Sequence, residues 1–130
     1  MVRHLIDKIQ KNKRKIIEVE EINMKDAEIV IVSYGISSRV AHRAMDLARE
    51  QGIKVGMLRL IVVWPFCDYM IRELAERIKA FVTVELNFGQ IALEVERCAG
   101  GKAACYLVPH AGGDVHNPDV ILEVIKEAAK

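Results

Sequence analysis

Three nearly uninterrupted apolar stretches, at residues 29–32, 55–63 and 81–84, limit the folds open to this sequence more than any other feature. A strand with one solvated face alternates apolar and polar residues, whereas continuous apolar stretches are typical of strands covered on both faces. Between and after them, apolar residues recur at helical spacing, at 40–48, 71–78 and 91–98. A fourth strand is predicted at 104–108, followed by a last helix.

Strand and helix therefore alternate four times. This alternation indicates parallel strands joined by right-handed crossovers, and thus a three-layer α/β/α sandwich with a mostly parallel sheet. Chemical signals mark the helix ends. Ser37 or Ser38 is the expected N-cap of the first helix, and Gly52 is expected just beyond its end. Asn117 is the expected cap of the last helix, with Pro118 in its first turn.

The beginning of the chain follows a different pattern. Residues 1–15 carry a sparse apolar stripe and a basic cluster, which predicts a short amphipathic lead-in helix or linker. Residues 16–22 alternate apolar and acidic side chains, which predicts a strand at or near a sheet edge with one face in solvent. We treat residues 16–130 as one α/β domain.

The composition limits the classes of function and of partner open to the chain. Of 130 residues, 19 are basic and 18 acidic, and a net charge of +1 argues against a domain that binds the nucleic-acid backbone. Three cysteines without a CxxC pair support neither a disulfide framework nor a thiolate metal cluster, so a reducing compartment is the default. No uncharged stretch approaches the roughly 20 residues that span a bilayer. We expect a cytoplasmic protein with no membrane or nucleic-acid partner.

In an open parallel sheet, ligands and partners meet the carboxyl ends of the strands, and four segments fall there. The first contains Tyr34, Gly35, Ser37 and Ser38 before a predicted helix start, where backbone N–H groups favour an anion. The segment lacks the GxGxxG pattern of dinucleotide sites, so a capped strand-to-helix turn is the favoured interpretation.

The second segment places Glu85, Asn87, Gly89 and Gln90 between a strand and a helix. A single carboxylate has no visible acid or base partner, so helix capping and interface or ligand contact stay equally open.

The other two segments contain aromatic and histidine residues. Trp64 and Phe66 end the second apolar stretch and form either an interface anchor, which we favour, or a satellite core. His110 and His116 lie in a glycine-rich loop with Asp114, but their spacing matches no compact zinc pattern. A flexible or partner-contacting loop is therefore favoured over a metal site.

These same segments resemble a known family. The resemblance is carried by residues 31–35, 52–56, 58–61 with 64–66, 85–90 with Glu94 and Val95, and 112–113 with His116 and Pro118. Together they resemble the C-terminal domain of the alpha subunit of 2-oxoacid:ferredoxin oxidoreductases, closest to the 2-oxoglutarate type. The resemblance runs from about Asp26 to the end, and the preceding residues resemble the segment that joins this domain to the one before it.

The resemblance implies a transketolase C-terminal-like fold, with five strands of which the first, at 16–22, is antiparallel to the rest. Such enzymes oxidise a 2-oxoacid to acyl-CoA and reduce ferredoxin, using thiamine diphosphate, Mg²⁺, an iron–sulfur cluster and coenzyme A. The implied role of this domain is assembly against the preceding domain and a thiamine-diphosphate-binding beta subunit, with ferredoxin an indirect partner. No catalytic residue, metal or cofactor is expected within the chain, so the chain alone is expected to be inactive.

Two points stay open beside the resemblance. Glu85, Asn87, Gly89 and Gln90 match the family's Glu-x-Asn-x-Gly-Gln motif in position, without an implied acid-base role. Cys67 stands where a second proline commonly follows the Trp-Pro-Phe equivalent. The alternative hypothesis is a stand-alone anion- or nucleotide-binding α/β module, with the anion at the helix start near Gly35 and Ser38.

Overall fold

The structure is a computed structural model that describes residues 19–35, 37–61, 67–85, 90–109 and 117–130. Its elements follow in the order β1 (Val19–Ile22), β2 (Ile29–Tyr34), α2 (Ser37–Glu50), β3 (Val55–Leu60), α3 (Asp68–Ala75), β4 (Ala80–Glu85), α4 (Gln90–Ala99), β5 (Ala104–Pro109) and α5 (Pro118–Ala129). The predicted lead-in helix at 1–15 and the first residues of the predicted strand at 16–22 lie outside the described residues.

The strands form one five-stranded sheet in the order β1-β3-β2-β4-β5. β2, β3, β4 and β5 are mutually parallel, and β1 pairs antiparallel with β3 at the sheet edge. The α/β class, the edge position of the first strand and its antiparallel direction are thereby confirmed. The predicted strand at 55–63 is too long, because β3 ends at Leu60 and Ile61 is already an exposed bend.

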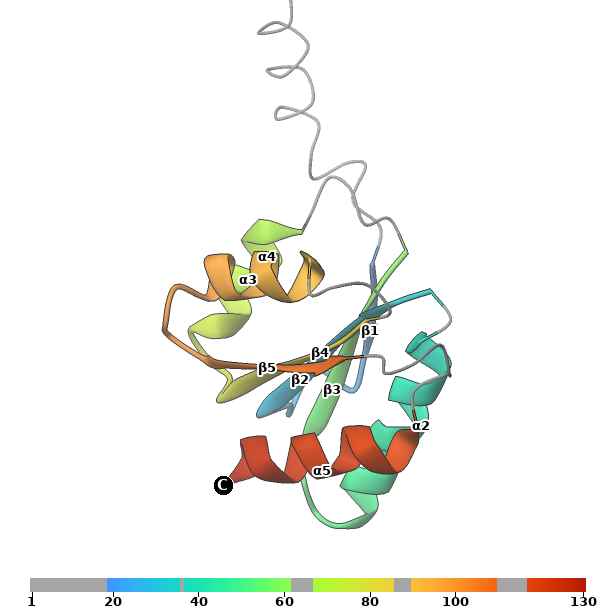
Figure 1. Cartoon of the computed structure of the whole chain (residues 1–130). Coiled ribbons are helices and arrows are strands. Elements are labelled where there is room, and N and C mark those ends of the chain that lie inside the picture. Colours follow the sequence, from blue (N-terminus) through green and yellow to red (C-terminus); the bar gives the residue numbers. More distant parts are fainter. Residues whose placement is uncertain (1–18, 36, 62–66, 86–89, 110–116) are drawn as a thin grey trace, which may run out of the picture.

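Helices cover both faces of the sheet, with α3 and α4 on one side and α2 and α5 on the other (Figure 1). The side chains of Ile29 and Ile31 point to the α2/α5 face, and those of Val30 and Val32 point to the α3/α4 face. All four are buried. The apolar stretches are continuous because successive residues face opposite layers, each covered by helices.

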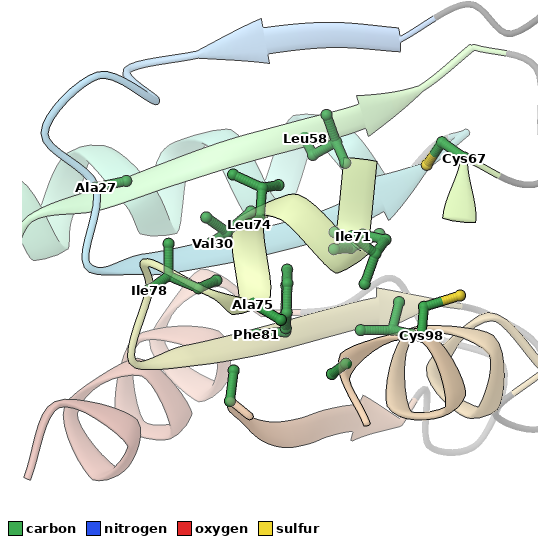
Figure 2. Close-up of a cluster of buried hydrophobic side chains, with 14 of the residues drawn as sticks. Ala27, Val30, Leu58, Cys67, Ile71, Leu74, Ala75, Ile78, Phe81 and Cys98 are labelled. Carbon is green, nitrogen blue, oxygen red and sulfur yellow. The ribbon is translucent and has the colours of Figure 1, made fainter. Parts of the chain in front are cut away.

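Phe81 is fully buried in the α3/α4 layer, beside Ile71 and Ala75 of α3 (Figure 2). In the opposite layer, α2 contributes Ala41, Ala44, Met45 and Ala48. Burial of one such large side chain stabilises the fold by about 1.5–3 kcal/mol. Because each layer buries several of them, its burial stabilises the fold several times more than any single surface contact.

Two helix ends are built as the sequence predicts. Gly52 has φ +84° and donates to the carbonyl of Arg49, while Ile53 donates to that of Ala48, which is a Schellman end. The side chain of Asn117 accepts a hydrogen bond of 2.8 Å from the backbone N–H of Asp119.

The predicted cap at the start of α2 is wrong for Ser38. Ser38 is the second residue of the helix, and its buried hydroxyl contacts the Ser33 hydroxyl at 3.1 Å. Ser37 is the first helical residue, and its side chain lies outside what the structure describes.

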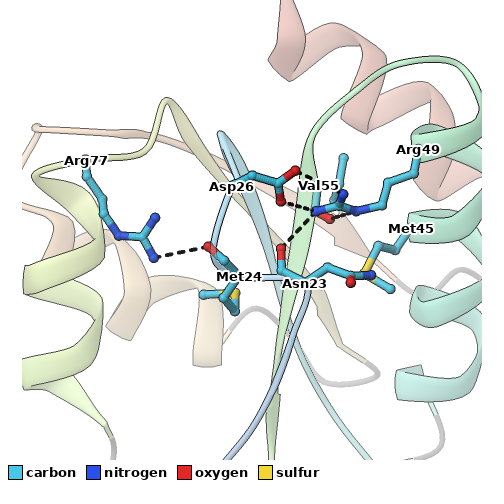
Figure 3. A network of polar contacts seen from close by, with 7 residues as sticks. All are labelled: Asn23, Met24, Asp26, Met45, Arg49, Val55 and Arg77. Atoms are coloured by element: carbon cyan, nitrogen blue, oxygen red, sulfur yellow. Dashed lines mark hydrogen bonds and ion pairs between the residues drawn. The ribbon is translucent and has the colours of Figure 1, made fainter.

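At the amino end of the parallel strands, Arg49 joins three segments (Figure 3). Its Nε donates to the carbonyl of Val55 at 2.7 Å, and its Nη2 donates to the carbonyl of Asn23 at 2.9 Å and to Asp26 Oδ1 at 2.8 Å. The hydrogen bond from Arg49 holds the pKa of Asp26 below its ordinary value. The last turn of α2 is thereby joined to β3 and to the β1–β2 connection.

Beside this network the β1–β2 connection lies directly on β3. A Cβ added at Gly56 would lie 2.9 Å from both Ala27 Cβ and Met24 Sδ and 3.0 Å from the Asn23 carbonyl oxygen. Only a glycine fits such a backbone approach without a shift of its neighbours. Across the described parts of the chain, no helix has the length and apolar character needed to cross a bilayer.

Candidate functional site

The candidate site is the carboxyl end of the sheet, where β2, β3, β4 and β5 terminate. The chain leaves β2 for α2 on one face, and it leaves the neighbouring β4 for α4 on the other face. Adjacent parallel strands whose connections diverge in this way mark a topological switch point, the usual place of a ligand crevice in open α/β sheets. The fold therefore brings the end of β2 next to the end of β4.

Tyr34 and Gly35 form the β2 side of the switch point. Tyr34 is half-buried and packs against the α3/α4 core. Gly35 is exposed with φ +64°, and its carbonyl accepts a hydrogen bond of 3.1 Å from the N–H of Ser38. The positive φ accounts for the glycine, since the space around a Cβ at this position would be open.

Ser33, near the end of β2, is a residue beside this turn that sequence reasoning did not single out. Its hydroxyl donates to that of Ser38 at 3.1 Å, and both side chains are buried. The contact joins the buried face of β2 to the first turn of α2. The signal in the sequence is a pair of small polar residues five positions apart, one in the strand and one in the helix.

Glu85 and Gln90 form the β4 side. Glu85 is the last residue of β4 and lies in register with Pro109 of β5, and Gln90 is the first residue of α4. Their backbone positions frame the predicted motif at the switch point, and their side chains lie outside the described part of the structure.

The remaining predicted site residues fall outside the described residues. These are Trp64, Phe66, Asn87, Gly89, His110 and His116. By sequence, each follows the carboxyl end of β3, β4 or β5, which is the end of the sheet just described. Their roles as interface or ligand contacts stay predictions.

The described side chains do not supply metal chemistry. Within the described ranges, no three histidine, cysteine or acidic residues gather as a cation site would require. Burial raises the pKa of the Cys98 and Cys105 thiols, so both favour the protonated form, which is a poor nucleophile and metal ligand. Cys67 is buried at the start of α3.

Comparison with known proteins places this geometry in a family. Residues 27–121, from the β1–β2 connection into α5, match the family described as pyruvate:ferredoxin oxidoreductase core domain II. The chain belongs to this family. The resemblance noted from the sequence is thereby confirmed, and the core domain II comprises most of the chain.

Curated relatives are subunits of oxidoreductases. The chain is 40% identical over 125 residues to 2-oxoglutarate synthase subunit KorA of Methanothermobacter marburgensis, covering 96% of this chain and 33% of the relative. It is 45% identical over 113 residues to ketoisovalerate oxidoreductase subunit VorB of the same organism, covering 87% of this chain and 32% of the relative. The chain thus spans about a third of the length of these relatives.

Solved structures agree on the fold. A 2-oxoglutarate:ferredoxin oxidoreductase from Magnetococcus marinus, with 2-oxoglutarate, coenzyme A and succinyl-CoA bound, superposes with a TM-score of 0.74 at 22% identity. That match covers 99% of this chain and 24% of the other. A split-gene transketolase in an inactive beta4 tetramer superposes with a TM-score of 0.71 at 17% identity, covering 84% of this chain and 41% of the other. The core domain II therefore has the fold seen in transketolase-like proteins.

Proposed function

We propose that this core domain II is an assembly domain of the alpha subunit of a 2-oxoacid:ferredoxin oxidoreductase, of the type that acts on 2-oxoglutarate. The observation that carries the proposal is the match over residues 27–121, supported by 40% identity to a 2-oxoglutarate synthase subunit. The whole enzyme would oxidatively decarboxylate the 2-oxoacid to acyl-CoA and reduce ferredoxin in the cytoplasm. Within it, residues 1–15 would join the core domain II, at 16–130, to the preceding domain.

The cofactors of such an enzyme would be held by other parts of it. The described residues do not fit an iron–sulfur cluster or a metal ion, because they hold no group of three potential ligands and their cysteines are buried or have raised thiol pKa values. The sequence also lacks a Gly-Asp-Gly…Asn pattern for a metal-bound thiamine diphosphate. We therefore derive no catalytic step within this chain.

What the domain would supply is a rigid docking surface at the carboxyl end of the sheet. Tyr34 and Gly35 would meet the preceding domain or the thiamine-diphosphate-binding beta subunit there, with the buried Ser38 supporting the turn beneath them. The same surface would include Ser37, Trp64, Phe66, Glu85, Asn87, Gly89, Gln90, His110 and His116. The rigidity has a visible source, since both faces of β2 and β4 are packed against helices.

The proposal is tested by activity and by association. The purified 130-residue chain, supplied with thiamine diphosphate, Mg²⁺, 2-oxoglutarate and coenzyme A, is expected to give no ferredoxin reduction. Activity is expected to appear only when the beta subunit and the rest of the alpha subunit are added. Turnover by the chain alone would refute the assembly role.

A variant pair locates the docking surface. Trp64→Ala is expected to weaken association with the remaining subunit parts by about 2 kcal/mol, the scale of an aromatic interface anchor, with an unchanged circular dichroism spectrum. Leu93→Ala is the control, because Leu93 is a large apolar side chain that is 66% exposed on α4. If both variants associate like the unchanged chain, Trp64 is not an anchor.

A further inference from the structure

A hollow of about 370 Å³ lies between the first turns of α2 and the β1–β3 pair, apart from the switch point between β2 and β4. Its lining residues are Glu20, Ile22, Ser38, Arg39, His42, Met57 and Arg59. The hollow exists because β1 extends the sheet by one strand beyond β3. α2 packs mainly against β2, β3 and β4.

The strand register explains how the walls and floor are formed. Ile22 lies opposite Met57 and Glu20 lies opposite Arg59, so these cross-strand pairs share the face that points to α2. Arg59 is in turn in register with Ser33 of β2. The floor is therefore apolar at Ile22 and Met57. A polar row of Glu20, Arg59 and Ser33 crosses three strands beneath the start of α2.

The upper wall comes from α2. Ser38 and His42 are four residues apart and so share one helix face, with Arg39 beside them. Three nitrogen-bearing side chains, those of Arg39, His42 and Arg59, thus line one hollow. The first turn of α2 also contributes the positive end of the helix dipole.

The two arginines are only partly neutralised. Arg59 Nη1 is 3.8 Å from Glu20 Oε2, a long contact between two half-exposed side chains. His42 pairs with Asp46 of its own helix at 3.3 Å. For Arg39, no ion pair is found among the residues described. Arg39 is exposed, so its guanidinium can swing over the hollow at little conformational cost.

Ser38 contributes a hydroxyl group to the lining of the hollow. Its side chain is 5% exposed and lines the hollow, while Ser33 donates to it at 3.1 Å. A contact between two hydroxyls uses one of their two hydrogens, so one hydrogen of the Ser33–Ser38 pair is left to donate. Because Ser38 lines the hollow, its hydroxyl can donate to an oxyanion bound there.

We propose that this hollow binds the phosphate group of a small phosphorylated ligand. Arg39 and Arg59 would contact its oxygens from opposite walls, Ser38 would donate to it, and His42 would close the side toward solvent. A phosphate suits these separate donors better than a carboxylate, because it presents three or four oxygens and up to two charges. The volume and the apolar floor leave room for the organic part of a phosphate ester.

The test is titration of the isotope-labelled 130-residue chain with inorganic phosphate, adenosine monophosphate and adenosine, followed by amide NMR at constant ionic strength. Phosphate and the monophosphate are expected to give saturable shifts at residues 38–42 and 57–60, and adenosine is expected to give none. A tenfold or greater preference for the monophosphate assigns the site to esters, and equal binding assigns it to free phosphate.

Matched variants separate this site from general attraction to a basic surface. Arg39→Gln and Arg59→Gln are each expected to weaken binding at least tenfold, and Ser38→Ala at least threefold. Arg43→Gln removes the same charge from the exposed side of α2, outside the hollow, and is expected to change binding less than twofold. Arg39→Gln is the deciding variant, because this exposed side chain can be replaced without disturbing the fold. Absence of saturable shifts, or equal losses in Arg39→Gln and Arg43→Gln, would overturn the proposal.

Discussion

The two ends of the sheet are built in different ways. At the amino end, Arg49 ties α2 to β3 and to the β1–β2 connection, and Gly56 lets that connection lie directly on β3. At the carboxyl end, Gly35 borders open space, and the hollow beside α2 is lined by half-exposed charged side chains. The polar groups around Arg49 at the amino end are hydrogen-bonded within the chain. The charged side chains at the carboxyl end are still available to bind a ligand or a partner.

From this contrast we expect the amino end to contribute mainly to stability and the carboxyl end mainly to binding. Substitutions at the amino end are expected to change the free energy of unfolding without changing association or ligand binding. Substitutions of the candidate residues at the carboxyl end are expected to do the reverse. Four predictions test how sharply the two ends divide, from the largest expected effect to the smallest.

The largest effect is expected at Gly56. Gly56→Ala is expected to destabilise the chain by about 3 kcal/mol, because the added methyl would lie 2.9 Å from Ala27 Cβ and Met24 Sδ. Urea unfolding measures the change. The double variant Gly56→Ala/Ala27→Gly removes one of the clashing methyl groups and is expected to recover part of the loss. A double variant that is less stable than the sum of its single changes would contradict the close approach as the cause.

Arg49→Ala is expected to cost about 2 kcal/mol, because the carbonyls of Val55 and Asn23 lose a charged donor. Arg43→Ala on the same helix is the control and is expected to change stability by less than about 0.5 kcal/mol, since Arg43 is exposed. Thermal and urea unfolding of both variants give the comparison. Equal effects would show that the amino end is not held by this network.

Asn117 tests whether the division is complete, because it contributes stability next to the carboxyl end. Asn117→Ala is expected to destabilise the chain by about 1 kcal/mol through loss of the bond that its side chain accepts from Asp119 N–H. Asn117→Asp keeps an acceptor and is expected to retain most of the stability. If the aspartate variant loses as much as the alanine variant, the cap does not stabilise α5.

The smallest effect is expected from acid. The hydrogen bond from Arg49 holds the pKa of Asp26 in the folded chain below its ordinary value of 3.8. Its contribution is therefore complete above about pH 4 and is lost as pH falls through the lower, folded value. Asp26→Asn is expected to flatten this part of the dependence of urea midpoints on pH. An unchanged acid limb in that variant would show that other groups cause it.

The fold could be predicted from the sequence to a large extent because its signals are local. The continuous apolar stretches mark strands covered on both faces, and Asn117 with Pro118 marks a helix start wherever it occurs. Gly52 marks a helix end for the same reason. The direction of β1 came from the family resemblance, since alternation alone does not distinguish a parallel edge strand from an antiparallel one.

The long-range polar contacts could not be predicted, because they join residues that only the tertiary structure brings together. Arg49 reaches Asn23 across 26 positions of sequence, and nothing in either segment indicates the other. The hollow is similar, since it depends on β1 extending past the cover of α2. Ser38 was expected to cap a helix because serine favours that role. Packing against the sheet turned it toward Ser33 instead.

The antiparallel pairing of β1 with β3 has a consequence for synthesis. Among the described strands β1 is bonded only to β3, and the whole of β2 and α2 lies between them along the chain. On the ribosome, the first strand must therefore wait until the third has emerged before it can be incorporated. Hydrogen-exchange protection of β1, measured in nascent chains of increasing length, would show at which length the β2–α2–β3 unit has formed.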